Sequence, residues 1–150
     1  MSVSVDQNTL LTTLKTYFGY DSFRNQQSKI IETVLGGDDA IVIMPTGGGK
    51  SICYQLPAVL FDGLTVVISP LIALMKDQVD GLKANGIAAD FYNSSQSAED
   101  QQKILDQVAH RELKLLYVAP ESLSGLNPIL NKTYISCIAI DEAHCISSWG

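Results

Sequence analysis

The stretch AIVIMPTGGGKSICYQL, residues 40–56, decides the fold of this chain. It begins with the apolar run Ala40–Met44, continues through Pro-Thr and three glycines, and returns to apolar residues after Lys50 and Ser51. This order predicts a buried strand, a glycine-rich turn and a helix that begins near Lys50. Such a turn brings free backbone N–H groups and the positive end of a helix dipole to one point, which favours a bound phosphate.

The residue types of the turn fit that chemistry. Glycines let the backbone wrap an anion without Cβ clashes, and Lys50 would reach the β- and γ-phosphates of a nucleotide. The hydroxyl of Ser51 would bind Mg²⁺. Met44, however, stands where the usual phosphate-loop pattern has its first glycine. Taken alone, the stretch is therefore also compatible with a plain glycine-rich turn.

A second motif follows the apolar segment 138–140, where Asp141 and Glu142 end the run. A strand in this position would place Asp141 at the carboxyl edge of the sheet, on the side where the turn after the first strand emerges. Asp141 would then hold the metal, and Glu142 would orient and deprotonate the attacking water. An isolated pair of acids is usually a solvated turn, but together with the phosphate loop it indicates phosphoryl transfer to water.

The periodicity of the chain switches repeatedly between strand-like and helix-like segments. This alternation predicts an α/β fold, a single domain over residues 1–150 with a mainly parallel sheet flanked by helices. The expected strands are 40–44, 64–69, 113–118 and 136–140, with 88–92 as a weaker fifth candidate, and the expected helices are 7–17, 24–35, 50–61, 71–85 and 96–109.

Composition limits the function classes. The net charge of −6 argues against a broad basic face, so any contact with nucleic acid would have to depend on local geometry. Cys53, Cys137 and Cys145 show no C-x-x-C spacing, which favours buried hydrophobic thiols over a disulfide framework or a zinc site. The sequence shows neither an apolar run of membrane-spanning length nor a signal peptide, so we expect a soluble, cytoplasmic protein.

Several motifs together resemble a known family. MPTGGGKS and DEAH resemble the two nucleotide-binding motifs of superfamily-two helicases, whose first motif commonly begins with Ala or Pro-Thr. FGYDSFRNQQ (18–27), VVISPLIALMKDQV (66–79), YVAPE (117–121) and DEAHCISSWG (141–150) are similar to motifs of RecQ helicases. The chain is thus identified as the first RecA-like, P-loop lobe of a RecQ-type helicase. Because no closing element follows CISSWG, we expect it to be an incomplete piece of a longer protein.

The resemblance implies ATP and Mg²⁺ as cofactors and assigns roles to individual residues. The implied catalytic residues are Lys50, Asp141 and Glu142, with Ser51 and Asp141 on the metal. The implied nucleotide-binding residues are Tyr20, Arg24, Gln27, Thr46, Gly47, Gly48, Gly49, Lys50 and Ser51, with Gln27 reading the adenine edge. The implied DNA-binding residues are Ser69, Pro70, Lys76, Asn93, Ser94 and Trp149.

The resemblance also implies an activity for the full-length protein, namely ATP-dependent translocation on single-stranded DNA and duplex unwinding in DNA repair and recombination. The implied partners are single-stranded and duplex DNA and a second RecA-like lobe of the same chain, in the cytoplasm or on a bacterial nucleoid, with no membrane contact. Three alternatives stay open from the residues: a DEAD/DEAH-type RNA helicase, a P-loop kinase or small-molecule ATPase, and a nucleotide-binding module that is inactive in isolation.

Overall fold

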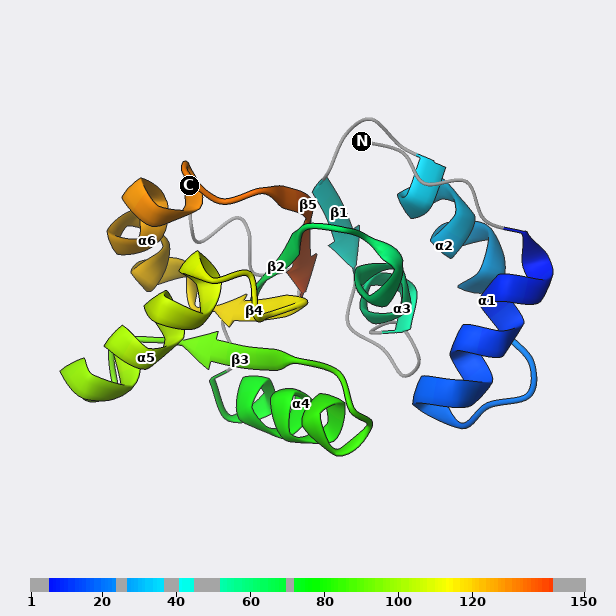
Figure 1. The fold of residues 1–150 in the computed structure, drawn as a ribbon, viewed down its shortest axis with the longest axis horizontal. Helices are drawn as coiled ribbons and strands as arrows, with labels where there is room; N and C mark the ends of the chain where they lie inside the picture. The colour runs from blue at the N-terminus through cyan, green and yellow to red at the C-terminus, as the bar shows by residue number, and fades with distance from the viewer. Residues whose placement is uncertain (1–5, 24–26, 37–40, 45–51, 70–71, 142–150) are drawn as a thin grey trace.

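The sheet at the centre of the molecule has five strands, all parallel. The structure, a computed structural model, describes residues 6–23, 27–36, 41–44, 52–69 and 72–141. Its strands are β1 (Ile41–Met44), β2 (Leu64–Ile68), β3 (Ala89–Tyr92), β4 (Leu115–Val118) and β5 (Ile135–Asp141), in the spatial order β1-β5-β2-β4-β3 (Figure 1). The predicted α/β fold with a mainly parallel sheet is confirmed, including the weaker candidate that became β3.

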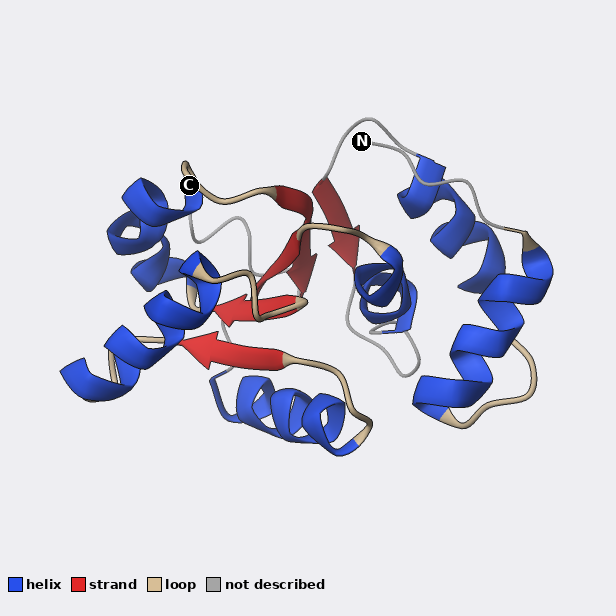
Figure 2. Ribbon diagram, viewed as in Figure 1, coloured by secondary structure: helices blue, strands red, loops and turns tan. Residues whose placement is uncertain are grey.

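Helices connect the strands (Figure 2). They are α1 (Gln7–Thr13) with the π-helical turn η1 (Leu14–Phe18), α2 (Gln27–Gly36), α3 (Ile52–Leu60), α4 (Ile72–Ala84), α5 (Ala98–Ala109), the 3-10 turn η2 (Pro120–Ser122) and α6 (Leu123–Leu130). The last two were not predicted. Helix α6 contains Gly125 and Pro128, two residues that disfavour helices, and its Leu123, Leu126 and Leu130 have helical spacing.

The two faces of the sheet carry different core clusters. In β2, Val67 packs in a cluster with residues of α3 and α4, whereas Val66 and Ile68 pack in a second cluster with residues of α5 and α6. This alternation is the period of two that a strand imposes on its side chains. Because both faces are covered, β2 is buried along its whole length, as expected for a parallel sheet. Figure 1 shows these helices on the two sides of the sheet.

The N-terminal helices are attached to α3 by a third core cluster. Leu10 and Leu14 from the first helical segment and Ile31 from α2 pack with Ile52 and Leu56 of α3. All five side chains are buried. The helix that directly follows the predicted phosphate loop is therefore covered by apolar side chains of the N-terminal segment.

The described cysteines behave as small hydrophobic residues. Cys53 and Cys137 are buried and are not joined to any other described residue by a disulfide, and burial raises the pKa of the Cys137 thiol to about 11. A thiol with such a pKa stays protonated at neutral pH, so it is a poor nucleophile and a poor metal ligand. The predicted role of these two cysteines is confirmed, and Cys145 lies outside the described residues.

Gly63, directly before β2, gives the first testable prediction. Its N–H donates to Ser136 Oγ at 2.9 Å, and a Cβ at this position would lie 2.6 Å from the backbone oxygen of Tyr134. We expect Gly63→Ala to lower the free energy of unfolding by about 1–3 kcal/mol, because the rigid backbone has to move. Gly81→Ala is the control, since its added Cβ on α4 meets no atom within 4 Å. The free energies of unfolding are measured by denaturant unfolding. Equal values for the two variants would contradict the close approach at Gly63.

Candidate functional site

The carboxyl ends of the five strands lie in one row. Met44 at the end of β1 pairs with Asp141 of β5, and Ile140 of β5 pairs with Ile68 of β2. Val118 of β4 pairs with Ile68 on one side and with Tyr92 of β3 on the other. Because the strands are parallel, the segments that follow them all leave from this edge of the sheet. The edge of a parallel sheet where the carboxyl ends meet is the usual position of a ligand site.

The order of the strands divides this edge into two ends. The predicted phosphate loop follows β1, and the predicted acidic pair begins with Asp141 on the neighbouring β5. The predicted DNA-binding residues Ser69 and Asn93 follow β2 and β3. With strands about 4.8 Å apart, the two ends of the row are separated by roughly 19 Å. The two predicted functions therefore map to different parts of one edge.

The position predicted for Asp141 is confirmed. It ends β5 beside Met44, so its backbone lies next to the point where the chain leaves β1. Gln27 is at the start of α2. Several predicted site residues lie outside the described part of the chain: Arg24, Thr46, Gly47, Gly48, Gly49, Lys50, Ser51, Pro70, Glu142 and Trp149.

Tyr20 lies in the segment between η1 and α2. Gly19 ends η1 with φ +78°, a left-handed conformation that glycine adopts without strain. Phe18 and Phe23 on either side pack against the third core cluster, which includes residues of α3. Tyr20 between them is 48% exposed. The segment is thus anchored by its two phenylalanines and presents the tyrosine to solvent.

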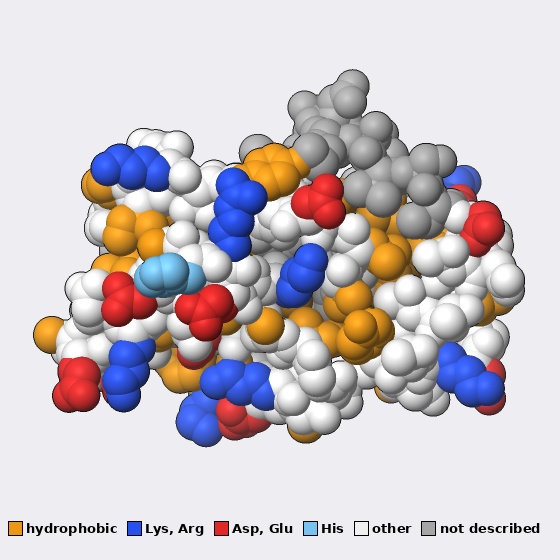
Figure 3. All heavy atoms as spheres, in the orientation of Figure 1, with side chains coloured by type: hydrophobic (Ala, Val, Ile, Leu, Met, Phe, Trp, Pro, Cys, Tyr) orange, Lys and Arg blue, Asp and Glu red, His pale blue; other side chains and the backbone are white. Residues whose placement is uncertain are grey.

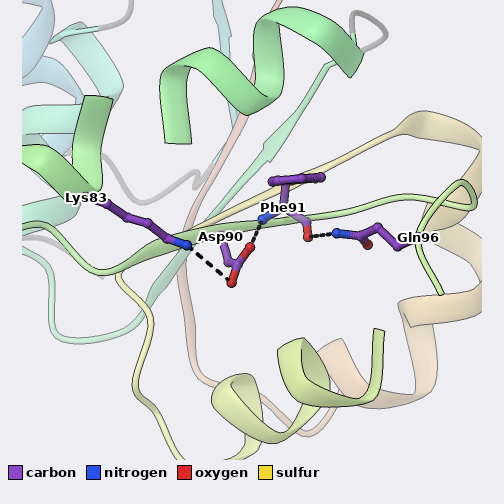
Figure 4. Close-up of polar contacts among 4 residues, drawn as sticks. All are labelled: Lys83, Asp90, Phe91 and Gln96. Atoms are coloured by element: carbon purple, nitrogen blue, oxygen red, sulfur yellow. Dashed lines mark hydrogen bonds and ion pairs between the residues drawn. The ribbon is translucent and has the colours of Figure 1, made fainter. Parts of the chain in front are cut away.

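The turn after β3 is fixed by side-chain amides. Gln96 accepts the N–H of Asn93 at 3.0 Å. The same side chain donates to the carbonyl of Phe91 at 3.0 Å (Figure 4). Gln101 donates to the carbonyl of Asn93 at 2.8 Å. Asn93 Oδ1 accepts from the N–H of Ser95 at 2.9 Å and also from its hydroxyl. This turn has several side-chain hydrogen bonds in place of regular secondary structure.

Exposure separates the predicted DNA-binding residues into two groups. Asn93 and Ser69 are buried; Asn93 Nδ2 has no hydrogen-bond partner among the described residues, and the N–H of Ser69 donates to the carbonyl of Val118 at 3.1 Å. Ser94 is exposed, and so is Lys76, whose Nζ lies 3.0 Å from Asp80 Oδ2. Ser94 and Lys76 can therefore reach a ligand directly, whereas the side chain of Asn93 holds the turn.

Four polar side chains, three of them buried and the fourth half-buried, were not singled out from the sequence. They are Tyr54 and Gln55 on α3, Tyr117 on β4 and Gln78 on α4, and hydrogen bonds join them. The sequence did hold a signal, because Gln55 interrupts an apolar helix and Tyr117 an apolar strand. A polar group at a position that periodicity assigns to the core needs a partner, since an unpaired one costs free energy.

Charged and metal-ligating side chains also occur outside this edge in the described part of the chain. In the ranges that the structure describes, no three His, Cys, Asp or Glu side chains are grouped so as to hold a metal ion. On the face drawn in Figure 3, Lys and Arg side chains are interspersed with Asp and Glu and form no continuous basic patch. Among the described helices, none combines the length and the apolar character needed to cross a bilayer.

A parallel sheet covered by helices on both faces, with the phosphate-loop motif after β1 beside Asp141, defines the class: a RecA-like nucleotide-binding lobe. The model of the DEAD/DEAH box helicase family matches residues 24–150. The chain belongs to this family, and the curated relatives that it resembles include RecQ DNA helicases.

Two of these relatives show the extent of the resemblance. The chain is 54% identical to the ATP-dependent DNA helicase RecQ of Haemophilus influenzae, covering 100% of this chain and 25% of the relative. It is 49% identical to the RecQ protein of Bacillus subtilis, covering 91% of this chain and 24% of that one. The chain therefore spans about a quarter of the length of these relatives. The crystal structure of the DUF1998 helicase MrfA bound to DNA and AMPPNP superimposes with a TM-score of 0.70 at 23% identity, over 94% of this chain and 21% of that one, and supports the fold alone.

Proposed function

We propose that the full-length protein is an ATP-dependent DNA helicase of the RecQ type, which couples ATP hydrolysis to translocation on single-stranded DNA and to duplex unwinding in repair and recombination. The observation that carries this proposal is the pairing of Met44 with Asp141, which brings the end of β1 and the start of the acidic motif together. The residues 1–150 would form its first RecA-like lobe.

The nucleotide end of the edge would hold ATP through the residues after β1 and β5. Lys50 would contact the β- and γ-phosphates, and Ser51 and Asp141 would hold Mg²⁺, as expected of a hydroxyl and a carboxylate. When bound, Mg²⁺ would neutralise charge on the phosphate oxygens. Glu142 would accept the proton of the attacking water.

The adenine would lie near the segment between η1 and α2. The amide of Gln27 can donate and accept at once, which suits the N6 donor and N7 acceptor of adenine. Tyr20 and Arg24 would flank the base, and Thr46 with the glycines 47–49 would surround the phosphates. The attachment of this segment to α3 supports the assignment, because it keeps the exposed Tyr20 close to the helix that follows the phosphate loop.

The DNA strand would follow the other end of the edge. Lys76 and Ser94 would contact its backbone through ammonium and hydroxyl groups, which bind phosphates without a large net charge, and the segment that contains Ser69 and Pro70 would lie along the strand. Asn93 would position Ser94 through the turn that it stabilises. Trp149 would stack on a base.

A second RecA-like lobe of the same chain would close over the nucleotide. Such a lobe would supply an arginine finger, which is worth about 10³–10⁵ in rate in related phosphoryl transfer. The length of the relatives supports this part of the proposal, since the chain spans about a quarter of them. We propose that the protein acts in the cytoplasm and, if its source is a bacterium, on the nucleoid.

The choice between DNA and RNA is directly testable. We expect ATP hydrolysis by the full-length protein to rise about 5- to 150-fold with single-stranded DNA, the range of ordinary coupling free energies, and much less with RNA of the same length and sequence. The measurement is steady-state hydrolysis at matched nucleotide concentration and salt, because phosphate contacts depend on salt. Equal or greater stimulation by RNA would favour the RNA-helicase alternative, which the DNA helicase relatives do not favour.

A further inference from the structure

Three elements of the fold are joined in the interior by a continuous chain of hydrogen bonds, which we call the tyrosine chain: Gln55, Tyr117, Tyr54 and Gln78. Gln55 Nε2 donates to the hydroxyl of Tyr117 at 2.9 Å, and the hydroxyls of Tyr117 and Tyr54 lie 3.3 Å apart. The hydroxyl of Tyr54 donates to Gln78 Oε1 at 2.9 Å. Both tyrosines are fully buried, and their rings pack edge to face with centroids 6.4 Å apart.

The donors and acceptors give the tyrosine chain a direction. A tyrosine hydroxyl has one proton, and that of Tyr54 is donated to Gln78 Oε1. Tyr54 must therefore accept from Tyr117, which in turn accepts from Gln55. Hydrogen bonds that point the same way along a chain polarise and strengthen one another at low dielectric. The tyrosine chain consequently links α3 to β4 through Gln55 and Tyr117, returns to α3 at Tyr54, and ends on α4 at Gln78.

The ends of the tyrosine chain lie close to the two ends of the proposed site. Helix α3, which carries Tyr54 and Gln55, begins at Ile52, directly after the predicted phosphate loop. Helix α4, which carries Gln78, begins at Ile72, after the predicted DNA-binding residue Ser69. On β4, the residue after Tyr117 is Val118, whose carbonyl accepts the N–H of Ser69 at 3.1 Å. The tyrosine chain thus joins α3, at the proposed nucleotide-binding end of the sheet edge, to the backbone at the proposed DNA-binding end.

We propose that the tyrosine chain transmits the state of the nucleotide site to the DNA-binding segments, so that ATP binding changes the affinity for single-stranded DNA. Its members are positioning residues, because they touch neither ligand. The proposal rests on the function proposed above and adds to it the route inside this lobe by which the two ends are coupled.

The longest link is where the tyrosine chain is most sensitive to movement. At 3.3 Å, the contact between the two hydroxyls is longer than the 2.7–2.8 Å that O–H···O bonds prefer. A small shift of α3 toward or away from β4 would therefore strengthen or break this link, while the core around it stays packed. If the link breaks, the core loses the hydrogen bond that joins the two hydroxyls, which is unfavourable. The shift is consequently passed on to Gln78 and α4.

The test measures coupling by binding alone. In the full-length protein, the Kd for single-stranded DNA is determined with and without a saturating non-hydrolysable ATP analogue, and the ratio of the two values is the coupling. We expect the wild-type ratio to differ from one by about 5-fold or more, and Tyr117→Phe, Tyr54→Phe and Gln78→Met each to bring it to within about twofold of one. The double variant Tyr54→Phe with Tyr117→Phe should lose no more than either single one, because both break the same chain.

Matched controls separate coupling from stability. Tyr134→Phe removes a half-buried tyrosine hydroxyl before β5, at the opposite edge of the sheet, and Val108→Ala removes buried apolar volume beneath α5 without touching the tyrosine chain. Both should keep the wild-type ratio even where the thermal midpoint falls. Because Gln78 is half-buried whereas Tyr54 and Tyr117 are buried, we expect Gln78→Met to disturb the fold less than either tyrosine variant.

The possible results distinguish this inference from the proposed function. If the wild-type protein shows the coupling and Tyr117→Phe and Gln78→Met retain it within about twofold, the tyrosine chain is not the route, and the helicase proposal stands. If the controls lose coupling as much as the tyrosine variants, stability explains the effect and the inference fails. If the wild-type protein binds neither DNA nor the analogue, the proposed function fails and the inference with it.

Discussion

Lys50→Ala in the full-length protein is expected to lower kcat/KM for ATP hydrolysis by about 10²–10³-fold or more, the usual cost of removing one group that stabilises developing charge. Lys50 directly follows three glycines and precedes α3, so its charge would lie at the positive end of that helix, where phosphates bind. Its loss should leave the fold intact, because the proposed role is electrostatic. Steady-state hydrolysis and the thermal midpoint are measured together.

Lys83→Ala is the matched control for the loss of one lysine charge. Lys83 lies at the end of α4 and pairs with Asp90 at 3.9 Å (Figure 4). Surface ion pairs of this kind contribute about 0–1 kcal/mol, so this variant should hydrolyse ATP like the wild type. Turnover of Lys50→Ala at the level of Lys83→Ala would show that the glycine-rich turn is not a phosphate loop.

Glu142→Gln is expected to keep Mg-ATP binding while lowering kcat by about 10²–10⁴-fold, the contribution of a general base. The amide keeps the shape of the side chain and loses the ability to accept the proton of water. Asp141→Asn should instead weaken Mg-ATP binding itself, because Asp141 is the proposed metal ligand at the end of β5. Equilibrium binding and single-turnover hydrolysis, measured separately, distinguish the two effects.

The control for these acidic residues lies at the other edge of the sheet. Glu112 is exposed and precedes β4 at its amino end, so Glu112→Gln makes the same chemical change far from Asp141. It should alter neither binding nor turnover. Hydrolysis at the wild-type rate in both Glu142→Gln and Asp141→Asn would contradict the proposed division between base and metal ligand.

The fold could be predicted largely from local patterns. Short, mostly apolar runs alternate with helical segments, and β2, which is buried along its whole length, has Thr65 as its one polar residue. The same pattern placed Asp141 at the carboxyl edge beside the end of β1, because parallel strands align their ends. Helix α6 was not predicted; it contains Pro128, and its Leu126 and Leu130 pack in the core cluster of β2 and α5.

The polar interior could not be predicted from the same patterns. Hydropathy treats Tyr54 and Tyr117 as core residues, and they are buried, but which hydroxyl meets which amide depends on how α3, β4 and α4 pack. The contact between Gln55 and Tyr117 joins residues far apart in the sequence, and no local periodicity contains that information. Likewise, the burial of Asn93 depends on amides that reach it from Gln96 and Gln101.

The order of the strands also determines which strand pairings can form early and which form late during synthesis. Among the described strands, β1 pairs only with β5, which is the last of the five in the sequence. During synthesis at about 5–20 residues per second, β1 would wait roughly 5–20 s for its partner to be made. Pairings between distant segments form late, since a long loop must close first. The nucleotide end of the edge, which depends on this pairing, would therefore be the last part of the sheet to be completed on the ribosome, with β1 exposed to other chains until then.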